Sequence, residues 1–242
     1  MAVLLALTTL ISTAVGGVVA LRHRDRLHLI LGFTAGVLLG LVAFDLLPEV
    51  FALAGTGRTF NLPTVTLPFM AGFLLLHLIE RSVSVHHAHE QDYGEHHHTP
   101  ELGWASAGAL SAHSFLDGVG IGLAFQVGEG LGFAVALAVI AHDFADGLNT
   151  VTLMLRHGNS AGRARVMLAV DALAPVLGAA STLLFSLPDT VLALYLAFFA
   201  GFLLYLATGD ILPEAHSGHP SRLTMVATIG GVAFIGGVVA LS

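Results

Sequence analysis

The sequence contains no cysteine and no lysine, and only 10% of its 242 residues are charged. Without cysteine the chain can form neither a disulfide nor a thiolate metal site, so any bound metal must be held by histidine, carboxylate or hydroxyl groups. The nine basic residues are all arginine, and sixteen acidic residues leave a formal net charge of −7. We therefore expect no nucleic-acid partner, because this charge offers no basic surface for one.

Apolar residues dominate the chain, at 55% by count, whereas soluble domains typically carry about 25% charged residues. Runs of the roughly 20 apolar residues that cross a bilayer recur between glycine, proline and charged breaks. This pattern predicts an all-α integral membrane protein with one transmembrane domain over residues 1–242. The predicted spans are at about 1–21, 28–53, 62–84, 103–127, 131–156, 164–187, 190–213 and 222–241.

The first span has no basic residue before it and is followed by Arg22, Arg24 and Arg26. We expect it to be retained rather than cleaved as a signal peptide. The location we expect is a bacterial or archaeal cell membrane.

The arginines are distributed unevenly between the two ends of the predicted spans. Eight of the nine lie in or beside the connections 1–2, 3–4, 5–6 and 7–8, and only Arg58 lies in connection 2–3. Cytoplasmic loops of membrane proteins accumulate arginine and lysine. The distribution therefore predicts that both termini are extracytoplasmic and that connection 3–4 is cytoplasmic.

Connection 3–4, at about residues 85–102, is rich in histidine: it contains His86, His87, His89, His96, His97 and His98. It has no apolar periodicity, so we expect a mobile loop. Neutral histidines of this kind bind divalent metal loosely. The alternative is a solvated linker with no metal-related role.

A short motif occurs twice in the sequence. Asp45–Glu49 reads D-L-L-P-E at the end of the second span, and Asp210–Glu214 reads D-I-L-P-E at the end of the seventh. Five spans separate them, so the two helices cross in opposite senses. Inverted repeats with proline-interrupted helices are common in secondary transporters. The alternative is two ordinary proline-containing helix ends with interfacial acids.

Two further motifs carry the strongest chemical signal. His113 and Asp117 lie four residues apart in the fourth span, and His142 and Asp146 do so in the fifth. Residues four apart share a helix face, so each pair can reach one cation. Intramembrane acids are costly, and no Lys or Arg lies at comparable depth in spans 4 to 6, which favours a bound cation or protons. A lone histidine that bonds to a neighbouring helix, or a lone protonated aspartate, is the alternative for each residue taken singly.

Three neighbouring residues extend this set: Asp143, Ser114 and Asp171. Asp143 and Ser114 hold equivalent positions after the two histidines, and Asp171 lies in the sixth span. We expect one site from His113, Asp117, His142 and Asp146, suited to zinc, iron(II), manganese or cobalt. A second, oxygen-rich site would use Asp117, Asp143, Asp146 and Asp171, with Ser114 at its edge.

These motifs, the eight spans and the His-rich loop resemble the ZIP family of divalent metal transporters. The resemblance covers essentially the whole chain. It implies a 3+2+3 helix arrangement, a binuclear site between spans 4 and 5, and movement of zinc or a similar ion toward the cytoplasm. It also implies an entrance near Asp45 and Glu49, an exit near Asp210, Glu214 and His216, and a homodimer.

The sequence departs from the family pattern at three ligand positions. Ser114 stands where many members have Asn, Asp143 where many have Glu, and Asp146 where Glu is common. A shorter acid reaches about one bond less far. These departures affect the occupancy of the second site and leave iron, manganese or cadmium selectivity open.

Other function classes remain at this point. Cation diffusion facilitators also use His-x-x-x-Asp pairs but have six spans. An intramembrane zinc-dependent hydrolase needs at least three firm ligands, an open position and a general base, and here the second half of each motif is Asp rather than His. A metal sensor that binds without transporting shares all the ligand evidence. We expect a transporter, with the metal ion as substrate and no separate cofactor, rather than an enzyme.

Overall fold

The chain was analysed as a computed structural model that describes residues 1–22, 27–91, 100–216 and 221–241. Within these ranges each of the eight predicted spans forms a helix over most of its length. The elements are α1 (Ala2–Arg22), α2 (Leu27–Leu41), η1 (Val42–Leu46), α3 (Leu47–Ala54), β1 (Arg58–Thr59), β2 (Leu62–Pro63), α4 (Thr66–Gln91), α5 (Pro100–Val127), α6 (Glu129–Arg156), α7 (Ala161–Ser181), η2 (Thr182–Leu184), α8 (Asp189–Tyr205), η3 (Leu206–Ile211), α9 (Leu212–His216) and α10 (Arg222–Leu241).

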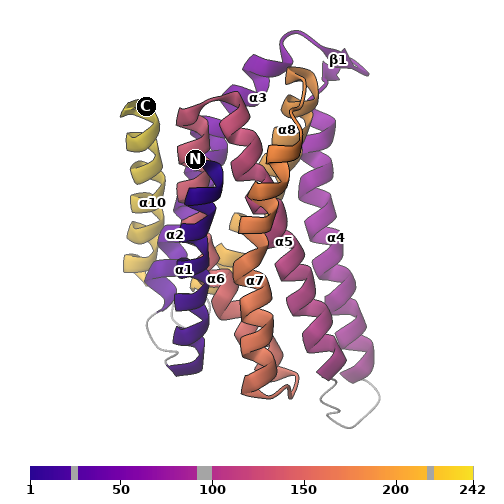
Figure 1. Ribbon diagram of the computed structural model, residues 1–242, viewed down its shortest axis with the longest axis vertical. Coiled ribbons are helices and arrows are strands. Elements are labelled where there is room, and N and C mark those ends of the chain that lie inside the picture. The colour runs from indigo at the N-terminus through magenta and orange to yellow at the C-terminus, as the bar shows by residue number, and fades with distance from the viewer. Residues whose placement is uncertain (23–26, 92–99, 217–220, 242) are drawn as a thin grey trace.

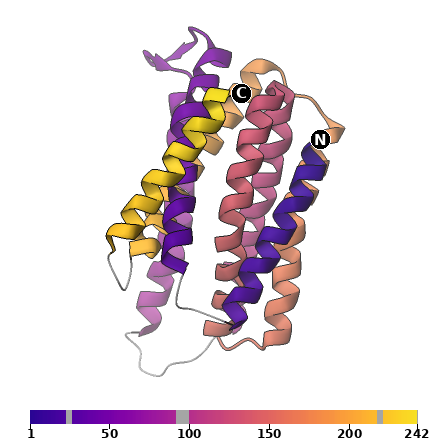
Figure 2. The same ribbon diagram turned by 90° about the vertical axis from the view of Figure 1, so that its left-hand side faces the viewer.

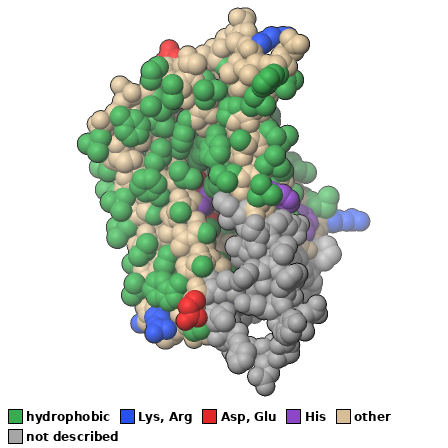
Figure 3. Space-filling view, turned by 90° about the vertical axis from the view of Figure 1, so that its right-hand side faces the viewer, with side chains coloured by type: hydrophobic (Ala, Val, Ile, Leu, Met, Phe, Trp, Pro, Cys, Tyr) green, Lys and Arg blue, Asp and Glu red, His purple; other side chains and the backbone are tan. Residues whose placement is uncertain are grey.

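Six helical segments of the described chain are long and apolar enough to cross a membrane. Two of the eight predicted spans are not among these six. The helix of the fourth span, α5, carries buried polar residues, and α4 contributes a shorter apolar stretch, Thr66–Leu78. Apolar side chains are spread along the described part of the face drawn in Figure 3, and many large ones are exposed. Both termini lie toward the end that carries the β1–β2 hairpin (Figures 1 and 2). The chain is thus an all-helical membrane protein, and the regular structure of its described residues is helical apart from this short hairpin.

The helix boundaries follow local chemistry. Ser160 caps α7 by accepting a hydrogen bond from the Arg163 backbone N–H at 3.3 Å, as polar residues do at helix starts. Gly128 separates α5 from α6, and Pro100 occupies the first position of α5, where its missing N–H is tolerated. The hairpin turns at Phe60 and Asn61, both with positive φ, the geometry of a two-residue type I′ turn.

The histidine-rich connection is shorter than predicted. Helix α4 continues to Gln91, so the backbone of His86, His87 and His89 is helical. No glycine or proline interrupts the sequence between Gly72 and Gly94, which explains the continuation. Residues 92–99, including His96 to His98, lie outside the described part of the chain.

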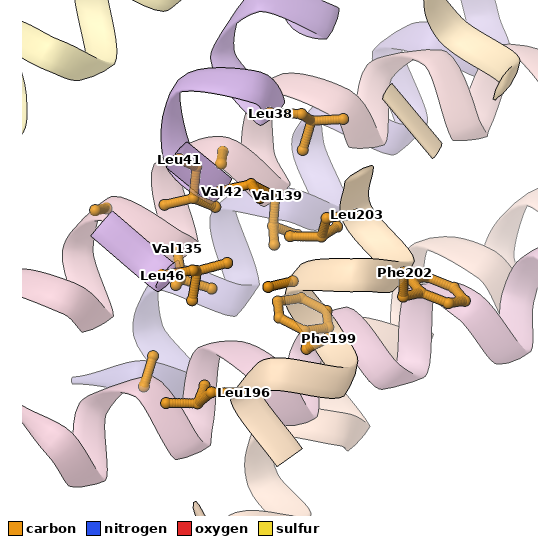
Figure 4. Close-up of a cluster of buried hydrophobic side chains, with 14 of the residues drawn as sticks. Leu38, Leu41, Val42, Leu46, Val135, Val139, Leu196, Phe199, Phe202 and Leu203 are labelled. Carbon is orange, nitrogen blue, oxygen red and sulfur yellow. The ribbon is translucent and has the colours of Figure 1, made fainter. Parts of the chain in front are cut away.

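The main apolar core lies where α2, α6 and α8 meet. Figure 4 shows Leu38, Leu41 and Leu46 facing Val135 and Val139 of α6 and the α8 residues Leu196, Phe199 and Leu203. A smaller cluster joins α5, α6 and α7 around Met154 and Met167. Around these cores α1 packs on α6 and α7, α5 on α6 and α7, α10 on α2, and α4 on α8.

Four of these helix contacts are built in the same way, each from two glycines. A methyl group at either glycine would overlap a backbone carbonyl oxygen of the facing helix, so only glycine permits the approach. The glycines and the oxygens they meet are as follows: Gly16 on Phe144 and Gly147 on Thr13 (α1–α6); Gly178 on Phe115 and Gly118 on Pro175 (α7–α5); Gly36 on Thr228 and Gly231 on Phe33 (α2–α10); Gly201 on Phe69 and Gly72 on Phe198 (α8–α4).

The two D-[LI]-L-P-E motifs share a local conformation. Each begins in a π-helical turn, η1 for Asp45 and η3 for Asp210, closed by a backbone bond from Leu47 N–H to Val42 O and from Leu212 N–H to Ala207 O. The proline that follows cannot donate to the preceding turn and its ring crowds a carbonyl there. A π turn adds one residue and is often found at functional sites.

Candidate metal centre

Four side chains converge at the contact between α5 and α6. His113 and Asp117 come from α5, and His142 and Asp146 from α6, each pair one helical turn apart. One ligand atom from each lies within 4.8 Å of all the others. All four residues are buried, with between 0% and 6% of their surface exposed. The two predicted pairs therefore form one cluster.

The spacing of the ligand atoms suits a small divalent cation. Asp117 Oδ2 lies 3.0 Å from His113 Nε2 and 3.3 Å from His142 Nε2. Asp146 Oδ2 lies 3.6 Å from His113 Nε2 and 3.7 Å from His142 Nε2. Zinc bonds of 2.0–2.2 Å in a tetrahedron place neighbouring ligand atoms roughly 3.3 Å apart. The side chains thus need only small shifts to surround one ion.

Several buried polar atoms of the cluster have no hydrogen-bond partner among the described residues: Asp117 Oδ1, Asp146 Oδ2 and both ring nitrogens of His113. Although His113 Nε2 lies 3.0 Å from Asp117, the two are not aligned as a hydrogen bond. Buried polar atoms are nearly always satisfied in proteins, so an unsatisfied group calls for a ligand. The arginines whose side chains are described, Arg58, Arg163, Arg165 and Arg222, are all exposed near helix ends or in the hairpin.

The two imidazoles are oriented by neighbouring groups. His142 Nδ1 lies 3.0 Å from the Ala138 carbonyl oxygen, which can only accept, so Nδ1 carries the proton and Nε2 presents its lone pair to the cluster. The His113 ring stacks on Phe202 of α8, with ring centroids 4.7 Å apart. Each histidine is thereby held in a ligating orientation before metal arrives.

Asp143 and Asp171 flank the cluster and are 1% and 0% exposed. Asp143 Oδ1 lies 3.9 Å from His142 Nε2, and its Oδ2 accepts a hydrogen bond from Thr13 of α1 at 3.3 Å. Asp171 accepts hydrogen bonds from Ser114 at 2.8 Å and from Thr150 at 3.0 Å. The three additional residues predicted from the sequence therefore adjoin the cluster without joining its four-residue core.

The predicted entrance and exit residues lie at the two π turns. Asp45 and Glu49 are half-buried, and Asp45 Oδ2 has no hydrogen-bond partner among the described residues. The backbone of Asp210 and Glu214 is placed in η3 and α9, but their side chains lie outside what the structure describes. His216 is half-buried, with Nδ1 2.9 Å from the Leu212 carbonyl oxygen.

Comparison with known proteins agrees with this centre. A family model described as ZIP zinc transporter matches residues 86–238, which include every ligand candidate. The chain belongs to the ZIP family. This family consists of transporters, not enzymes, and its members are integral membrane proteins. Zinc transporter SLC39A7 of Mus musculus is 31% identical over 144 residues, a match that takes in 55% of this chain and 30% of the mouse protein.

Some residues of the centre were not predicted from the sequence: Thr13, Thr150 and Phe202. Thr150 follows Asp146 by four residues on the same face of α6, so helical periodicity could have identified it. Thr13 and Phe202 come from helices without a ligand motif, and their proximity depends on the packing of α1 and α8. Only the tertiary structure reveals them.

Proposed function

We propose that this ZIP-family chain carries divalent metal ions, zinc first, across the membrane toward the cytoplasm. The observation that carries the proposal is the buried cluster of two imidazoles and two carboxylates within 4.8 Å at the α5–α6 contact. Its mixed nitrogen and oxygen ligands suit zinc, and also iron(II), manganese, cobalt or cadmium. The ion is the transported substrate.

A second ion is proposed beside the first. Asp117 and Asp146 would be shared, while Asp143 and Asp171 would supply further oxygens, with Ser114 at the edge. Asp143 Oδ1 is buried without a hydrogen-bond partner in the described chain and lies on the cluster side of its carboxylate, 3.9 Å from His142 Nε2. This supports Asp143 as a direct ligand.

The 3+2+3 inverted repeat is also a proposal. In this repeat α1, α2 and α4 would correspond to α7, α8 and α10, and α5 would correspond to α6. The contact between α1 and α6 would then correspond to the contact between α7 and α5. The contact between α2 and α10 would correspond to the contact between α8 and α4. The glycine contacts support this relation, because their spacings match. Gly16 follows Thr13 by three residues, and Gly178 follows Pro175 by three. The glycines that face them, Gly147 and Gly118, each follow the histidine of their own helix by five residues. The matching π turns of the two D-[LI]-L-P-E motifs agree with it.

The direction of transport rests on two features. Arg163, Arg165 and Arg222 begin helices at the end opposite the hairpin, which favours that end as cytoplasmic and the termini as extracytoplasmic. Asp45 and Glu49 would then lie on the entry path, and Asp210, Glu214 and His216 on the exit path. Rocking of one helix group against another around the fixed site would expose it alternately to the two sides.

Uptake of radioactive zinc into proteoliposomes tests the proposal. Wild-type protein is compared with His142→Ala, Asp146→Ala and the control Asp189→Ala, which changes an exposed acid at the start of α8. We expect uptake by wild type and the control and none by the two site variants. Zinc binding without uptake by the wild-type protein would indicate a sensor and contradict transport.

A further inference from the structure

The two flanking carboxylates lie at corresponding helix contacts but on opposite partners. At the α1–α6 contact the acid is Asp143 of the central helix, and the hydroxyl donor is Thr13 of the outer helix. At the α7–α5 contact the acid is Asp171 of the outer helix, and the donor is Ser114 of the central helix. Acid and hydroxyl have exchanged places.

The exchange is in register. Asp143 precedes Gly147 by four residues, and Ser114 precedes Gly118 by four. Asp171 precedes Gly178 by seven residues, and Thr9 precedes Gly16 by seven. Because these glycines fix the two contacts, Asp143 corresponds to Ser114 and Thr9 corresponds to Asp171. Thr9 is fully buried and adjoins the Asp143 carboxylate.

Each contact therefore holds one carboxylate opposite at least one hydroxyl. Thr150 adds a second donor to Asp171, so that both of its oxygens accept a hydrogen bond. A carboxylate with one hydrogen bond per oxygen keeps a lone pair on each for a metal. Groups of this kind orient ligands and raise metal affinity.

We infer that each helix contact must supply one carboxylate to the metal centre, and that either helix of the pair can carry it. The hydroxyls of Thr13, Ser114 and Thr150 are positioning residues that hold these acids toward the cluster. The inference rests on the proposed function for the identity of the ion and on the proposed inverted repeat for the correspondence of the two contacts, but its test is made on zinc binding and does not require transport.

The hydroxyls also have local partners that permit a purely structural role. Thr13 Oγ1 lies 3.0 Å from the Thr9 carbonyl oxygen, and Ser114 Oγ lies 3.1 Å from that of Leu110. Such bonds satisfy a hydroxyl inside a helix without any effect on a carboxylate. A test at Thr13 or Ser114 that merely removes the hydroxyl would therefore not decide, and the first experiment moves the acid instead.

The decisive experiment relocates the acid at the α1–α6 contact. Zinc affinity of the purified full-length protein is measured by calorimetry for wild type, Asp143→Ser, Thr9→Asp and the double variant Thr9→Asp/Asp143→Ser. We expect Asp143→Ser to weaken binding about 10-fold to 100-fold and the double variant to recover most of that loss. Thr9→Asp alone should not bind more tightly than wild type, because the contact already holds its acid.

A double variant that is monodisperse and binds as weakly as Asp143→Ser overturns the inference. If the double variant does not fold, Thr150→Ser and Thr150→Val decide: we expect the serine variant to bind like wild type and the nearly isosteric valine variant to bind more weakly. Equal affinity of these two variants also overturns the inference. Zinc binding that follows these expectations in a protein without uptake would refute the proposed transport but not this inference.

Discussion

The contact between α5 and α6 and the contact between α2 and α10 belong to the same helical bundle. The first is made by buried ionisable side chains, and the second is made by glycines and apolar side chains. The first holds two buried imidazoles and two buried carboxylates whose ligand atoms point at one another. The second is held by Gly36 and Gly231 against facing carbonyl oxygens, beside apolar side chains. A change at the first contact should remove chemistry and spare the fold, and a change at the second should do the reverse.

The largest expected effect is at Asp117, whose Oδ2 lies nearest both histidines. Asp117→Asn keeps the shape of the side chain but removes its charge and one ligand oxygen. We expect zinc affinity to fall by more than about 100-fold, beyond the range seen when only a group supporting a ligand is lost. Calorimetry on detergent-solubilised protein measures it, with Asp189→Asn at an exposed position as the control. Unchanged affinity would refute the four-ligand centre.

The next largest effect is expected at the α2–α10 contact, where a substitution should lower the stability of the fold and leave the metal centre unchanged. In Gly231→Ala the added methyl overlaps the Phe33 carbonyl oxygen, whereas in Gly230→Ala it meets nothing within 4 Å. Overpacking of a close contact costs about 1–3 kcal/mol, while alanine at an open helical position is favoured over glycine. We expect the melting temperature in detergent to fall for Gly231→Ala and to hold or rise for Gly230→Ala. A fall in both, or in neither, would contradict the glycine contact.

A smaller effect is expected at Phe202, which contacts both the metal centre and the apolar core. Its ring stacks on His113 at 4.7 Å and also belongs to the apolar core. An aromatic pair contributes about 0.5–1.5 kcal/mol beyond area burial. Phe202→Leu should therefore weaken zinc binding roughly 2-fold to 13-fold. Phe234→Leu, which disrupts the ring pair with Phe33 on α10 and α2, is the matched control and should leave zinc affinity unchanged.

The same comparison explains how much the sequence could predict. Intramembrane charge is rare enough that two His-x-x-x-Asp pairs identified the four residues of the buried cluster, and apolar run lengths located all eight helices. The surroundings of Asp143 and Asp171 were harder to predict, because they depend on which helices face these two acids. The hydroxyls of Thr13 and Thr150 are ordinary helix residues until α1 and α7 are packed on the centre.

The glycine contacts could not be paired from sequence either. Glycine is common in transmembrane helices, and Gly230 and Gly231 are adjacent in the sequence while only Gly231 meets the facing helix. The extension of α4 to Gln91 was missed because a polar, histidine-rich segment gives no apolar period, although nothing in its composition prevents a helix. The sequence thus predicted the buried charged residues but not the contacts that depend on helix packing.

The smallest expected effect concerns the prolines after the two π turns. Pro48→Ala and Pro213→Ala each restore a backbone N–H donor, which lets the π turn revert to regular α-helix. A π turn contains one residue more than an α turn, and each residue of an α-helix turns the chain by about 100°. The reversion therefore rotates the acid that precedes the proline by about 100° around the helix axis. Zinc affinity at the α5–α6 centre should stay within about threefold of wild type, or less than ~1 kcal/mol. The maximal rate of uptake should fall, because Asp45 or Asp210 leaves its place on the proposed path.

The proposed inverted repeat requires that the two proline variants affect uptake in the same way. If the motifs are equivalent parts of one path, both proline variants should lower the rate at saturating zinc, while Pro63→Ala in the β2 strand should not. Uptake kinetics in proteoliposomes, with initial rates measured across a range of zinc concentrations, separate the rate from the affinity. A fall in rate for only one proline variant would argue against functional equivalence of the two π turns while leaving the metal centre intact.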